Sequence, residues 1–449
     1  MSLVASLKSK REILPQLDRI LNRLDVDLGS GSKRFNTFGK EQTIPEIVSE
    51  IISRVKVSGD KAVSECLELI DKVEVDPQKL RVSSEEFEIA RAEISPELEA
   101  SLQLMCKRIE AYAKAMMPKP SAWFSEETGR ELGYRFTAIE SIGAYVPGGL
   151  GASTPLISTV LMNLLPAKVA GVKKMVVSTP SGKGGKVHPA LLRACELAGV
   201  THVYRAGGAQ GIAAMALGTE SCPACHKIIG PGNAFVQEAK RQLYGKIDID
   251  MMAGPSEIAI ISDEGAQPSV IAADLIAQAE HDPMASSVLF SPSESQIQEV
   301  EVELEKQLSE LPKETIARES LKTFGALCLV KDLDEACELS DHFAPEHLEL
   351  AVADPKALIP KLSHAGAIFC GYHTPEVAGD YTAGPSHTLP TCGAARFASG
   401  ITVYSFLKSS SLLHYTSEAM KEDLASLTVM AREENLEGHA RSAESRFKG

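Results

Sequence analysis

Residues 174–217 read KMVVSTPSGKGGKVHPALLRACELAGVTHVYRAGGAQGIAAMAL, and short apolar runs alternate there with segments of helix length. The runs 174–178 and 202–204 have the length and apolar character of buried strands, whereas 189–197 and 209–217 suit helices. Repeated strand–helix alternation produces parallel sheets with right-handed crossovers. These residues therefore predict an α/β fold.

The same alternation continues along most of the chain. Further strands are predicted at 227–229, 257–262, 287–291, 327–330, 348–352 and 368–370, and further helices at 233–244, 268–280 and 293–311. The first third is predicted to be helical, because apolar residues recur with helical spacing at 13–24, 44–57 and 98–112. From about residue 402 the chain is predicted to return to helix.

Composition narrows the class of protein. A chain of 449 residues is expected to form two substantial units, since one domain commonly holds about 100–200 residues. The formal net charge of −14 argues against nucleic acid as the main partner, because proteins that bind it usually carry a basic surface. A local pocket can still bind an anion against the overall charge.

The sequence shows no export or membrane signal. Lys8, Lys10 and Arg11 interrupt the N-terminal segment before it reaches the length of a signal peptide. No run approaches the roughly 18 consecutive apolar residues of a membrane span. We therefore expect a soluble, cytoplasmic protein with no membrane partner, in which the nine cysteines are reduced thiols.

Several side chains stand in patterns that suit a metal site. Gln278 and His281 are three residues apart near the end of a predicted helix, so both project from one face. Asp380 and His387 lie in a glycine-bracketed segment after a predicted strand. Imidazole, carboxylate and amide oxygen are all metal ligands. The alternatives are a histidine at a helix C-terminus and a polar turn closed by an Asx bond. His439, in a charged tail, reads on its own as a surface residue.

Glu346 and His347 form an adjacent carboxyl–imidazole pair, after Pro345 and at the start of a predicted strand. Unperturbed, these groups titrate near about 4 and about 6.5, which suits paired acid–base work. The alternative is a solvated loop carboxylate beside a surface imidazole.

Glycine-rich loops at 145–149, 206–210 and 230–235 could present backbone amides to phosphate, since the last two join a strand to a helix. None matches G-x-G-x-x-G, so a nucleotide site here would be atypical, and close-packed turns are the alternative. The segment Cys222-Pro223-Ala224-Cys225-His226 matches a haem-attachment pattern. Without an export route, a packed loop explains it better.

Taken in order along the chain, these motifs resemble the histidinol dehydrogenase family, over roughly residues 35 to 440. The resemblance rests on YVPGG (145–149), GGAQ (207–210), GPGNAFV (230–236), AGPSE (253–257), QAEH (278–281), APEHL (344–348), GDY (379–381) and LPT (389–391). As an ordered set they are specific. The departures, at Gly211, Cys392 and 394–396, touch none of the chemical residues.

The resemblance implies roles for individual residues. One zinc ion would be bound by Gln278, His281, Asp380 and His439. Glu346 and His347 would be the acid–base pair, and Tyr145, Gln210 and Asn233 would contact NAD. The substrate-binding set would be Ser256, Gln278, His281, His347, Asp380, Glu434 and His439.

The resemblance also implies an architecture, which we expect to consist of two Rossmann-like parallel-sheet domains with a helical N-terminal segment and a small extended helical C-terminal tail. The expected divisions are an N-terminal segment (1–34), a first domain with most zinc and acid–base residues (35–144 and 257–401), an NAD-binding second domain (145–256) and the tail (402–449). The family is homodimeric, and its tail completes the site of the partner subunit.

The implied reaction is the zinc- and NAD-dependent oxidation of L-histidinol to L-histidine, through bound L-histidinaldehyde, in the last steps of histidine biosynthesis. The alternative activity is that of a sister dehydrogenase, which oxidises another hydroxy or sulfonated alcohol. A zinc-stabilised binding protein and a haem protein remain as readings from other classes.

Overall fold

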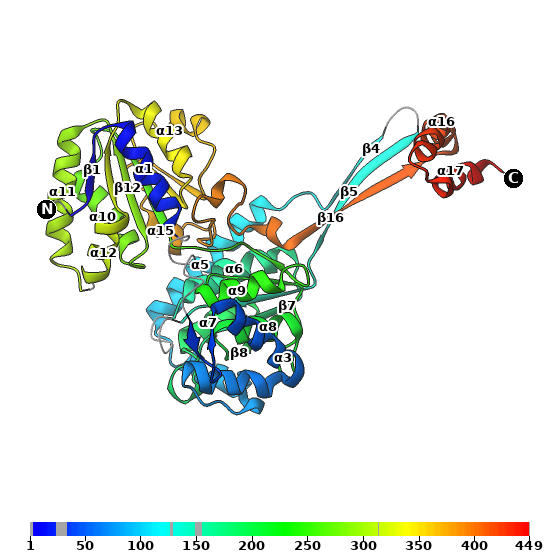
Figure 1. The fold of residues 1–449 in the computed structure, drawn as a ribbon, viewed down its shortest axis with the longest axis horizontal. Coiled ribbons are helices and arrows are strands. Elements are labelled where there is room, and N and C mark those ends of the chain that lie inside the picture. The colour runs from blue at the N-terminus through cyan, green and yellow to red at the C-terminus, as the bar shows by residue number, and fades with distance from the viewer. Residues whose placement is uncertain (1–2, 24–33, 126–128, 149–154, 313, 449) are drawn as a thin grey trace. The chain divides into compact units, whose positions relative to one another are not determined.

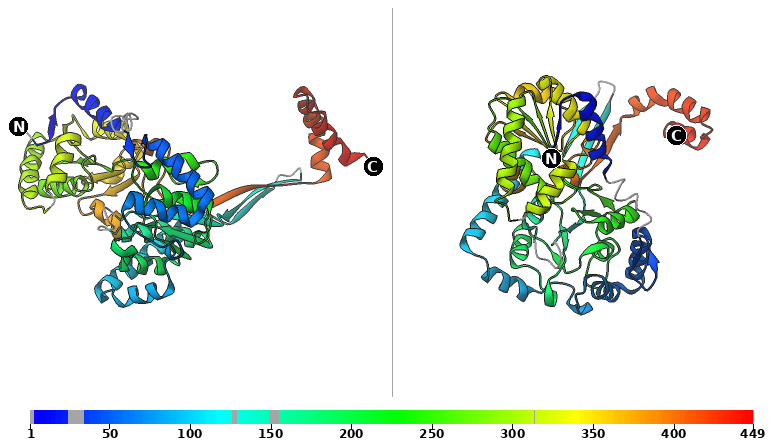
Figure 2. Two further views of the ribbon diagram at one scale, coloured as in Figure 1. Left: turned by 60° about the horizontal axis from the view of Figure 1, so that its bottom comes forward. Right: turned by 60° about the vertical axis from the view of Figure 1, so that its left-hand side comes forward.

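A computed structural model describes residues 3–23, 34–125, 129–148, 155–312 and 314–448 (Figure 1). The chain divides into two compact units. The first comprises Met1–Met116 and Glu140–Ser405, and the second comprises Met117–Ile139 and Phe406–Gly449. The predicted α/β class is confirmed, since the first unit contains two parallel sheets flanked by helices (Figure 2).

One parallel sheet of the first unit has six strands in the order β1-β13-β12-β11-β14-β15. These strands are β1 (Ala5–Leu7), β11 (Glu257–Ser262), β12 (Ser286–Ser291), β13 (Ala326–Leu329), β14 (His347–Ala351) and β15 (Ala367–Cys370). Its helices are α1 (Lys10–Leu21), α10 (Pro268–Ala279), α11 (Glu294–Leu308), α12 (Glu314–Phe324), α13 (Leu333–Phe343), α14 (Pro355–Leu358) and α15 (Glu376–Tyr381).

Alternate side chains of β11 show which helices cover each face of this sheet. Ile258 and Ile260 pack with the buried side chains of α10, α11 and α12, whereas Ala259 and Ile261 pack with those of α1 and α13. Successive side chains of a strand point to opposite faces, so both faces of β11 must be apolar. This is why its sequence is a continuous apolar run.

The other parallel sheet has five strands in the order β10-β9-β6-β7-β8. They are β6 (Ser141–Tyr145), β7 (Lys174–Ser178), β8 (His202–Tyr204), β9 (Lys227–Ile229) and β10 (Asp248–Ile249). The surrounding helices are α3 (Ile44–Cys66), α4 (Ser84–Ala92), α5 (Pro96–Met116), α6 (Ile157–Ala170), α7 (Pro189–Ala198), α8 (Gly208–Leu217) and α9 (Ala234–Leu243). A short hairpin, β2 (Phe35–Asn36) and β3 (Glu41–Gln42), precedes α3.

The structure groups residues 44–116 differently from the expected first domain. The buried face of α3, with Ile47, Ile51 and Val55, packs against α8 and α9, and α4 and α5 pack on α7 and α6. These helices therefore belong with the five-stranded sheet, because their apolar stripes are buried there. Strand β6 also begins this sheet at Ser141, ahead of the expected boundary at residue 145. Residues 117–139, expected in the first domain, lie in the second unit, and β1 of the expected N-terminal segment pairs with β13 of the six-stranded sheet.

The second unit is an antiparallel sheet with two helices. It contains β4 (Ser121–Ser125), β5 (Arg130–Ala138) and β16 (Leu407–Tyr415), followed by α16 (Ser417–Glu433) and α17 (Glu437–Glu444). The prediction of helix from residue 402 is wrong for β16, where the serine-rich run 409–411 pairs with β5. Serine is a weak helix former, so pairing with β5 prevails. Arg130 of β5 anchors α16 through a bidentate bond to Asp423.

None of the helices among the described residues is both long enough and apolar enough to cross a membrane. All nine cysteines carry free thiols, as predicted.

Candidate active site

The predicted acid–base pair lies at the amino end of β14. Helix α13 stops at Phe343 because Ala344 is left-handed (φ 50°) and Pro345 cannot continue a helix. His347 therefore begins the buried strand β14, and Glu346 directly precedes it. The two residues are 4% and 5% exposed. Burial of both groups contradicts the alternative of a solvated loop.

Glu257, at the amino end of the neighbouring strand β11, holds both members of the pair through its backbone. Its N–H donates to Glu346 Oε2 at 3.2 Å, and its carbonyl oxygen lies 3.1 Å from His347 Nδ1. Gln278 Oε1 is also 3.1 Å from that nitrogen. Two acceptors face Nδ1, so Nδ1 carries the proton and Nε2 presents a lone pair.

Burial shifts the pKa values of both members of the pair away from their ordinary values. It lowers the pKa of His347 to about 4, so the imidazole is neutral near pH 7. Burial also raises the pKa of Glu346 well above its ordinary value, and the charge of Glu257 adds to the effect. A neutral imidazole and a strongly basic carboxyl group suit proton transfer near neutrality.

Two carboxyl groups of α15 face His347. Glu376 Oε1 is 3.5 Å from His347 Nε2, and ligand atoms of His347, Glu376 and Asp380 lie within 4.8 Å of one another. Glu376 is 1% exposed, and burial, followed by the charge of Asp380, raises its pKa to about 8. Sequence reasoning missed Glu376, although its position four residues before Asp380, on one helix face, is a usable signal.

The pKa of the Asp380 carboxyl group is lower than its ordinary value, although the side chain is partly buried. Burial is the largest single influence and would raise its pKa, but the contact with His387 and the nearby His347 and His281 together outweigh burial and lower it. His387 Nδ1 is 3.4 Å from Asp380 Oδ1, and its Nε2 is 3.2 Å from Thr159 Oγ1 at the start of α6. A carboxylate among imidazoles is a suitable hard ligand for a divalent cation.

Three of the four predicted metal ligands belong to the first unit, and two of them, Gln278 and Asp380, lie beside His347. Gln278 is fully buried against His347, and its Nε2 has no hydrogen-bond partner among the described residues. His281 is exposed, two residues after α10 ends, and it is close enough to Asp380 to help lower its pKa. Ser256, a predicted substrate contact, hydrogen-bonds Glu346.

Glu434 and His439 belong to the second unit, where both are exposed. Glu434 caps the C-terminus of α16, and the N–H of His439 bonds Leu436 in the first turn of α17. Their predicted roles at the metal and the substrate stay a prediction.

The residues predicted to contact NAD lie on the carboxyl edge of the five-stranded sheet: Tyr145 and Asn233 follow β6 and β9, where the strand order reverses, and Gln210 follows β8. Tyr145 ends β6, and its hydroxyl accepts from Gly208 N at 3.3 Å. Gln210, 1% exposed, donates to Asp71 Oδ2 at 2.8 Å. Asn233 Oδ1 caps α9 by accepting from Phe235 N and Val236 N. Gly149, in the first glycine loop, lies outside the described residues.

Asp71 is a second residue that sequence reasoning missed. Desolvation raises its pKa to about 6, although the bond from Gln210 lowers it. It ends the turn after α3, and Lys72 adopts a left-handed conformation (φ 57°) there. No motif marks this turn, so only the three-dimensional contact identifies it.

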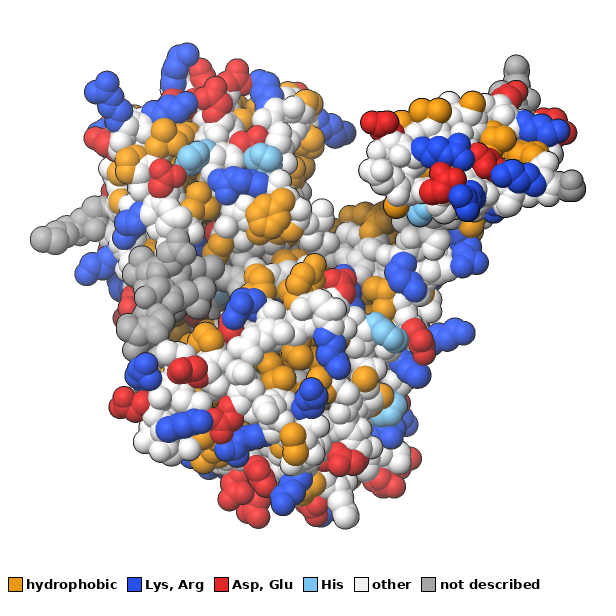
Figure 3. Space-filling model, turned by 45° about the vertical axis from the view of Figure 1, so that its right-hand side comes forward, with side chains coloured by type: hydrophobic (Ala, Val, Ile, Leu, Met, Phe, Trp, Pro, Cys, Tyr) orange, Lys and Arg blue, Asp and Glu red, His pale blue; other side chains and the backbone are white. Residues whose placement is uncertain are grey.

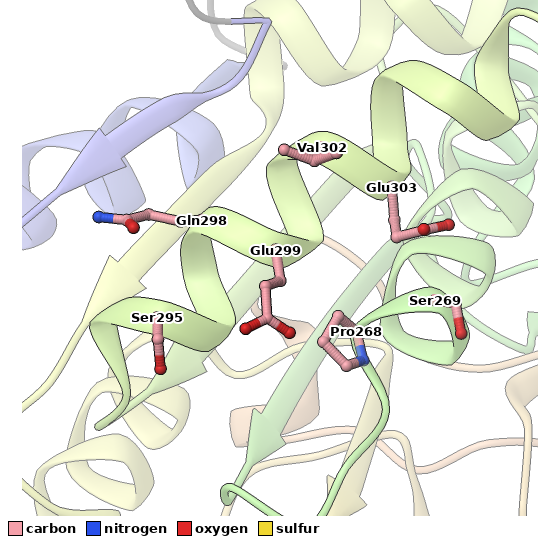
Figure 4. A pocket seen from close by; sticks show the side chains of 7 residues that line it. All are labelled: Pro268, Ser269, Ser295, Gln298, Glu299, Val302 and Glu303. Atoms are coloured by element: carbon pink, nitrogen blue, oxygen red, sulfur yellow. The ribbon is translucent and has the colours of Figure 1, made fainter.

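Two other features carry no chemistry for this site. Cys222 and Cys225 are buried, and burial raises the pKa of both thiols, which leaves them packed and unreactive. A surface pocket between α10 and α11 contains none of the predicted residues (Figure 4). It is lined by Pro268, Ser269, Ser295, Gln298, Glu299, Val302 and Glu303.

Comparisons with known proteins agree on one family. Residues 36–447 match the family described as histidinol dehydrogenase. The chain is 46% identical over 401 residues to histidinol dehydrogenase of Thermosynechococcus vestitus, with 89% of this chain and 92% of the relative covered. It is 44% identical over 429 residues to that of Rhizobium meliloti, covering 95% and 98%. The crystal structure of histidinol dehydrogenase from Elizabethkingia anophelis superposes with a TM-score of 0.91 at 32% identity, covering 100% and 99%.

Proposed function

We propose, from the premise that the chain belongs to the histidinol dehydrogenase family, that this dehydrogenase oxidises L-histidinol to L-histidine with NAD and one zinc ion, in the last steps of histidine biosynthesis. The observation that carries the proposal is the buried pair Glu346–His347, held at one strand end by Glu257 and faced by Gln278, Glu376 and Asp380. Binding alone does not require such a pair.

The five-stranded sheet fits a dinucleotide. Open parallel sheets bind ligands outside the carboxyl ends of their strands, at the point where strand order reverses. Tyr145 and the loop 230–233 lie at that point, at the ends of β6 and β9, and Gln210 lies on the same carboxyl edge, in the first turn of α8 after β8. A Cβ at Gly230 (φ 111°) would collide with the Tyr145 carbonyl oxygen, so glycine is required there. NAD, when bound, supplies the hydride acceptor.

The six-stranded sheet fits a metal ion. Gln278 offers a buried amide oxygen beside His347, and Asp380 offers a carboxylate whose pKa is lowered beside His387. We propose Gln278, His281 and Asp380 as ligands from one subunit and His439 as the fourth, a mixed nitrogen and oxygen set that suits zinc. Zinc, when bound, holds and orients the amino alcohol.

His347 and Glu346 divide the proton transfers. As hydride leaves the carbinol carbon, His347 Nε2 accepts the hydroxyl proton and the substrate becomes the bound aldehyde. Glu346 then accepts a proton from water while its oxygen adds to the aldehyde carbon and forms the hydrate. His347 Nε2 releases the first proton to solvent before the second oxidation, and it then takes a proton from the hydrate as a second hydride leaves for NAD. The bond from Nδ1 to Glu257 keeps Nε2 directed at the substrate.

We further propose a homodimer in which the tail of one subunit supplies Glu434 and His439 to its partner. The second unit supports this, because Leu413, Val429 and Met430 are 60% or more exposed. Figure 3 shows such hydrophobic side chains between charged ones on the surface of this unit. Exposed apolar side chains in a group favour a covering partner. The nine free thiols support work in the reducing cytoplasm.

The substrate and the cofactors are tested together. Purified enzyme with bound zinc measured by elemental analysis should form two NADH per L-histidinol, and chelation of zinc should abolish the reaction. Turnover of a sulfonated diol, with none of L-histidinol, would assign the chain to the sister activity instead.

Tail exchange has its own experiment. A His347→Asn variant mixed with a His439→Ala variant should recover activity, because a hybrid dimer contains one site with an intact body and an intact partner tail. Two inactive variants that stay inactive after subunit exchange, with exchange verified, would contradict the proposal.

A further inference from the structure

Helix α9 fastens the loop Gly230–Asn233 through two buried side chains. Lys240 Nζ donates to the Gly230 carbonyl oxygen at 3.1 Å, and Gln237 Nε2 donates to the Gly232 carbonyl oxygen at 3.2 Å. The two residues are three positions apart, so they lie on one face of the helix. Lys240 and Gln237 are 0% and 8% exposed, and such burial is rare for lysine and glutamine. Their polar groups therefore bond to the protein and not to solvent.

Each side chain also reaches a second partner. Lys240 forms a buried ion pair with Asp250, whose other carboxylate oxygen accepts from Gly230 N at 2.7 Å. Both backbone groups of Gly230 are therefore held by one charge pair. Gln237 Oε1 accepts from Ala253 N at 3.2 Å, at the start of the segment that leads to Ser256 and β11. Gln237 thus ties the glycine loop to the polypeptide that carries the substrate contact.

We propose that Lys240 and Gln237 are positioning residues for the reaction: Lys240 with Asp250 holds the Gly230–Asn233 loop in the form that receives NAD, and Gln237 sets the distance between that loop and the segment 253–256. The proposal rests on the proposed function, because it takes this loop as part of the NAD site.

The arrangement has a physical reason. Gly230 lies against the Tyr145 carbonyl oxygen at a positive φ that favours glycine. Because glycine has no side chain, Gly230 cannot hold the loop in place by a side-chain contact. A loop free to move would lose part of its affinity when a ligand orders it. Hydrogen bonds from a buried ammonium and a buried amide remove that freedom beforehand, because leaving either group unpaired would be costly.

The test uses the full-length dimer with zinc bound, and NAD itself as the probe. The variants are Gln237→Met, which is close in volume and removes both bonds, and the double variant Lys240→Met/Asp250→Asn, which removes the buried charges and keeps an acceptor for Gly230 N. The matched control is Arg241→Gln on the exposed side of α9, where Arg241 pairs with Glu238.

Calorimetric titration should show the Kd for NAD raised about tenfold or more in both variants, since a hydrogen bond to a charged or buried group contributes about that factor. The KM for L-histidinol should change less than about twofold in the double variant, whereas Gln237→Met should also lower kcat. Gln237→Glu keeps an acceptor for Ala253 N and should recover kcat relative to Gln237→Met. If the two residues had a purely structural role, NAD binding would weaken, kcat would fall and the KM for L-histidinol would rise, all together with a lower melting temperature.

The failures are distinguishable. NAD affinities of both variants within about twofold of Arg241→Gln, with wild-type binding intact, would overturn this inference alone. No NAD binding by the wild-type enzyme would overturn the proposed function and this inference with it. If Gln237→Met fails to fold, the double variant decides by the same measurement.

Discussion

The two parallel sheets reverse their strand order in the same way, but the side chains proposed for NAD binding and for proton transfer stand at opposite edges. In the five-stranded sheet, Tyr145 and the loop 230–233 follow the carboxyl ends of β6 and β9, where the order reverses. In the six-stranded sheet the order reverses between β11 and β14, and Glu257 and His347 stand at the amino ends of those strands.

The carboxyl edge of the six-stranded sheet is closed instead. Asp263, directly after β11, accepts from Tyr372 Oη at 2.7 Å, Ala353 N at 2.8 Å and Gly265 N at 2.9 Å. A carboxylate that is already bonded at this position satisfies the loop ends and disfavours an anionic ligand. The proposed NAD site thus lies at only one of the two points where strand order reverses, and the side chains at each edge account for that difference.

The largest effect is expected from His347→Asn. Asparagine cannot accept the hydroxyl proton, so kcat should fall about 10²- to 10⁴-fold, the usual contribution of a positioned acid–base group. Steady-state kinetics of NADH formation measures this, with the KM for NAD expected to stay near wild type. A kcat within tenfold of wild type, with zinc content unchanged, would contradict the role of His347.

Gln210→Ala addresses the opposite edge. The change removes the bond to Asp71 and leaves that carboxyl group without its partner, so the KM for NAD should rise about tenfold. The kcat at saturating NAD should change little. A variant that loses kcat but keeps its affinity for NAD would contradict a role for Gln210 in binding NAD.

Glu257→Gln should move the pH profile. In the hydration step Glu346 must be ionised, and its raised pKa means that activity falls as pH decreases through a value above the ordinary one. Removing the charge of Glu257 lowers the pKa of Glu346, so the acidic limb of kcat against pH should shift to lower pH. A shift to higher pH, or none, would exclude this coupling.

Asp263→Ala should have the smallest effect on catalysis. It removes three hydrogen bonds at the closed edge, so the free energy of unfolding should fall by about 1–3 kcal/mol, measured by urea denaturation. Both kcat and the KM for NAD should stay within about twofold of wild type. A large rise in the KM for NAD would show that this edge takes part in binding.

The sequence predicted eight strands of the parallel sheets to within one or two residues, because strands such as 257–262 are buried on both faces and read as continuous apolar runs. It did not predict β1, β6 or β10 of these sheets. It missed β4, β5 and β16, in which exposed and partly buried residues predominate and no apolar run marks the strand. Pairing between residues 130–138 and 407–415 joins positions that are 269 (Ala138 and Leu407) to 285 (Arg130 and Tyr415) apart, which a local pattern does not contain.

The candidate site was predictable in part, for a similar reason. Glu346, His347, Gln278 and Asp380 stand in motifs of the family, and the structure brings them together. Glu376 and Asp71 stand in no motif that the sequence analysis used. The spacing of Glu376 to Asp380 could have indicated it, whereas only the contact with Gln210 identifies Asp71.

The division of labour between the two sheets is tested most directly by titrating three proteins with NAD in a calorimeter: wild type, His347→Asn and Gln210→Ala. Wild type and His347→Asn should bind NAD with the same Kd, and Gln210→Ala should bind about tenfold more weakly. Weakened binding by His347→Asn, with wild-type affinity in Gln210→Ala, would contradict the account.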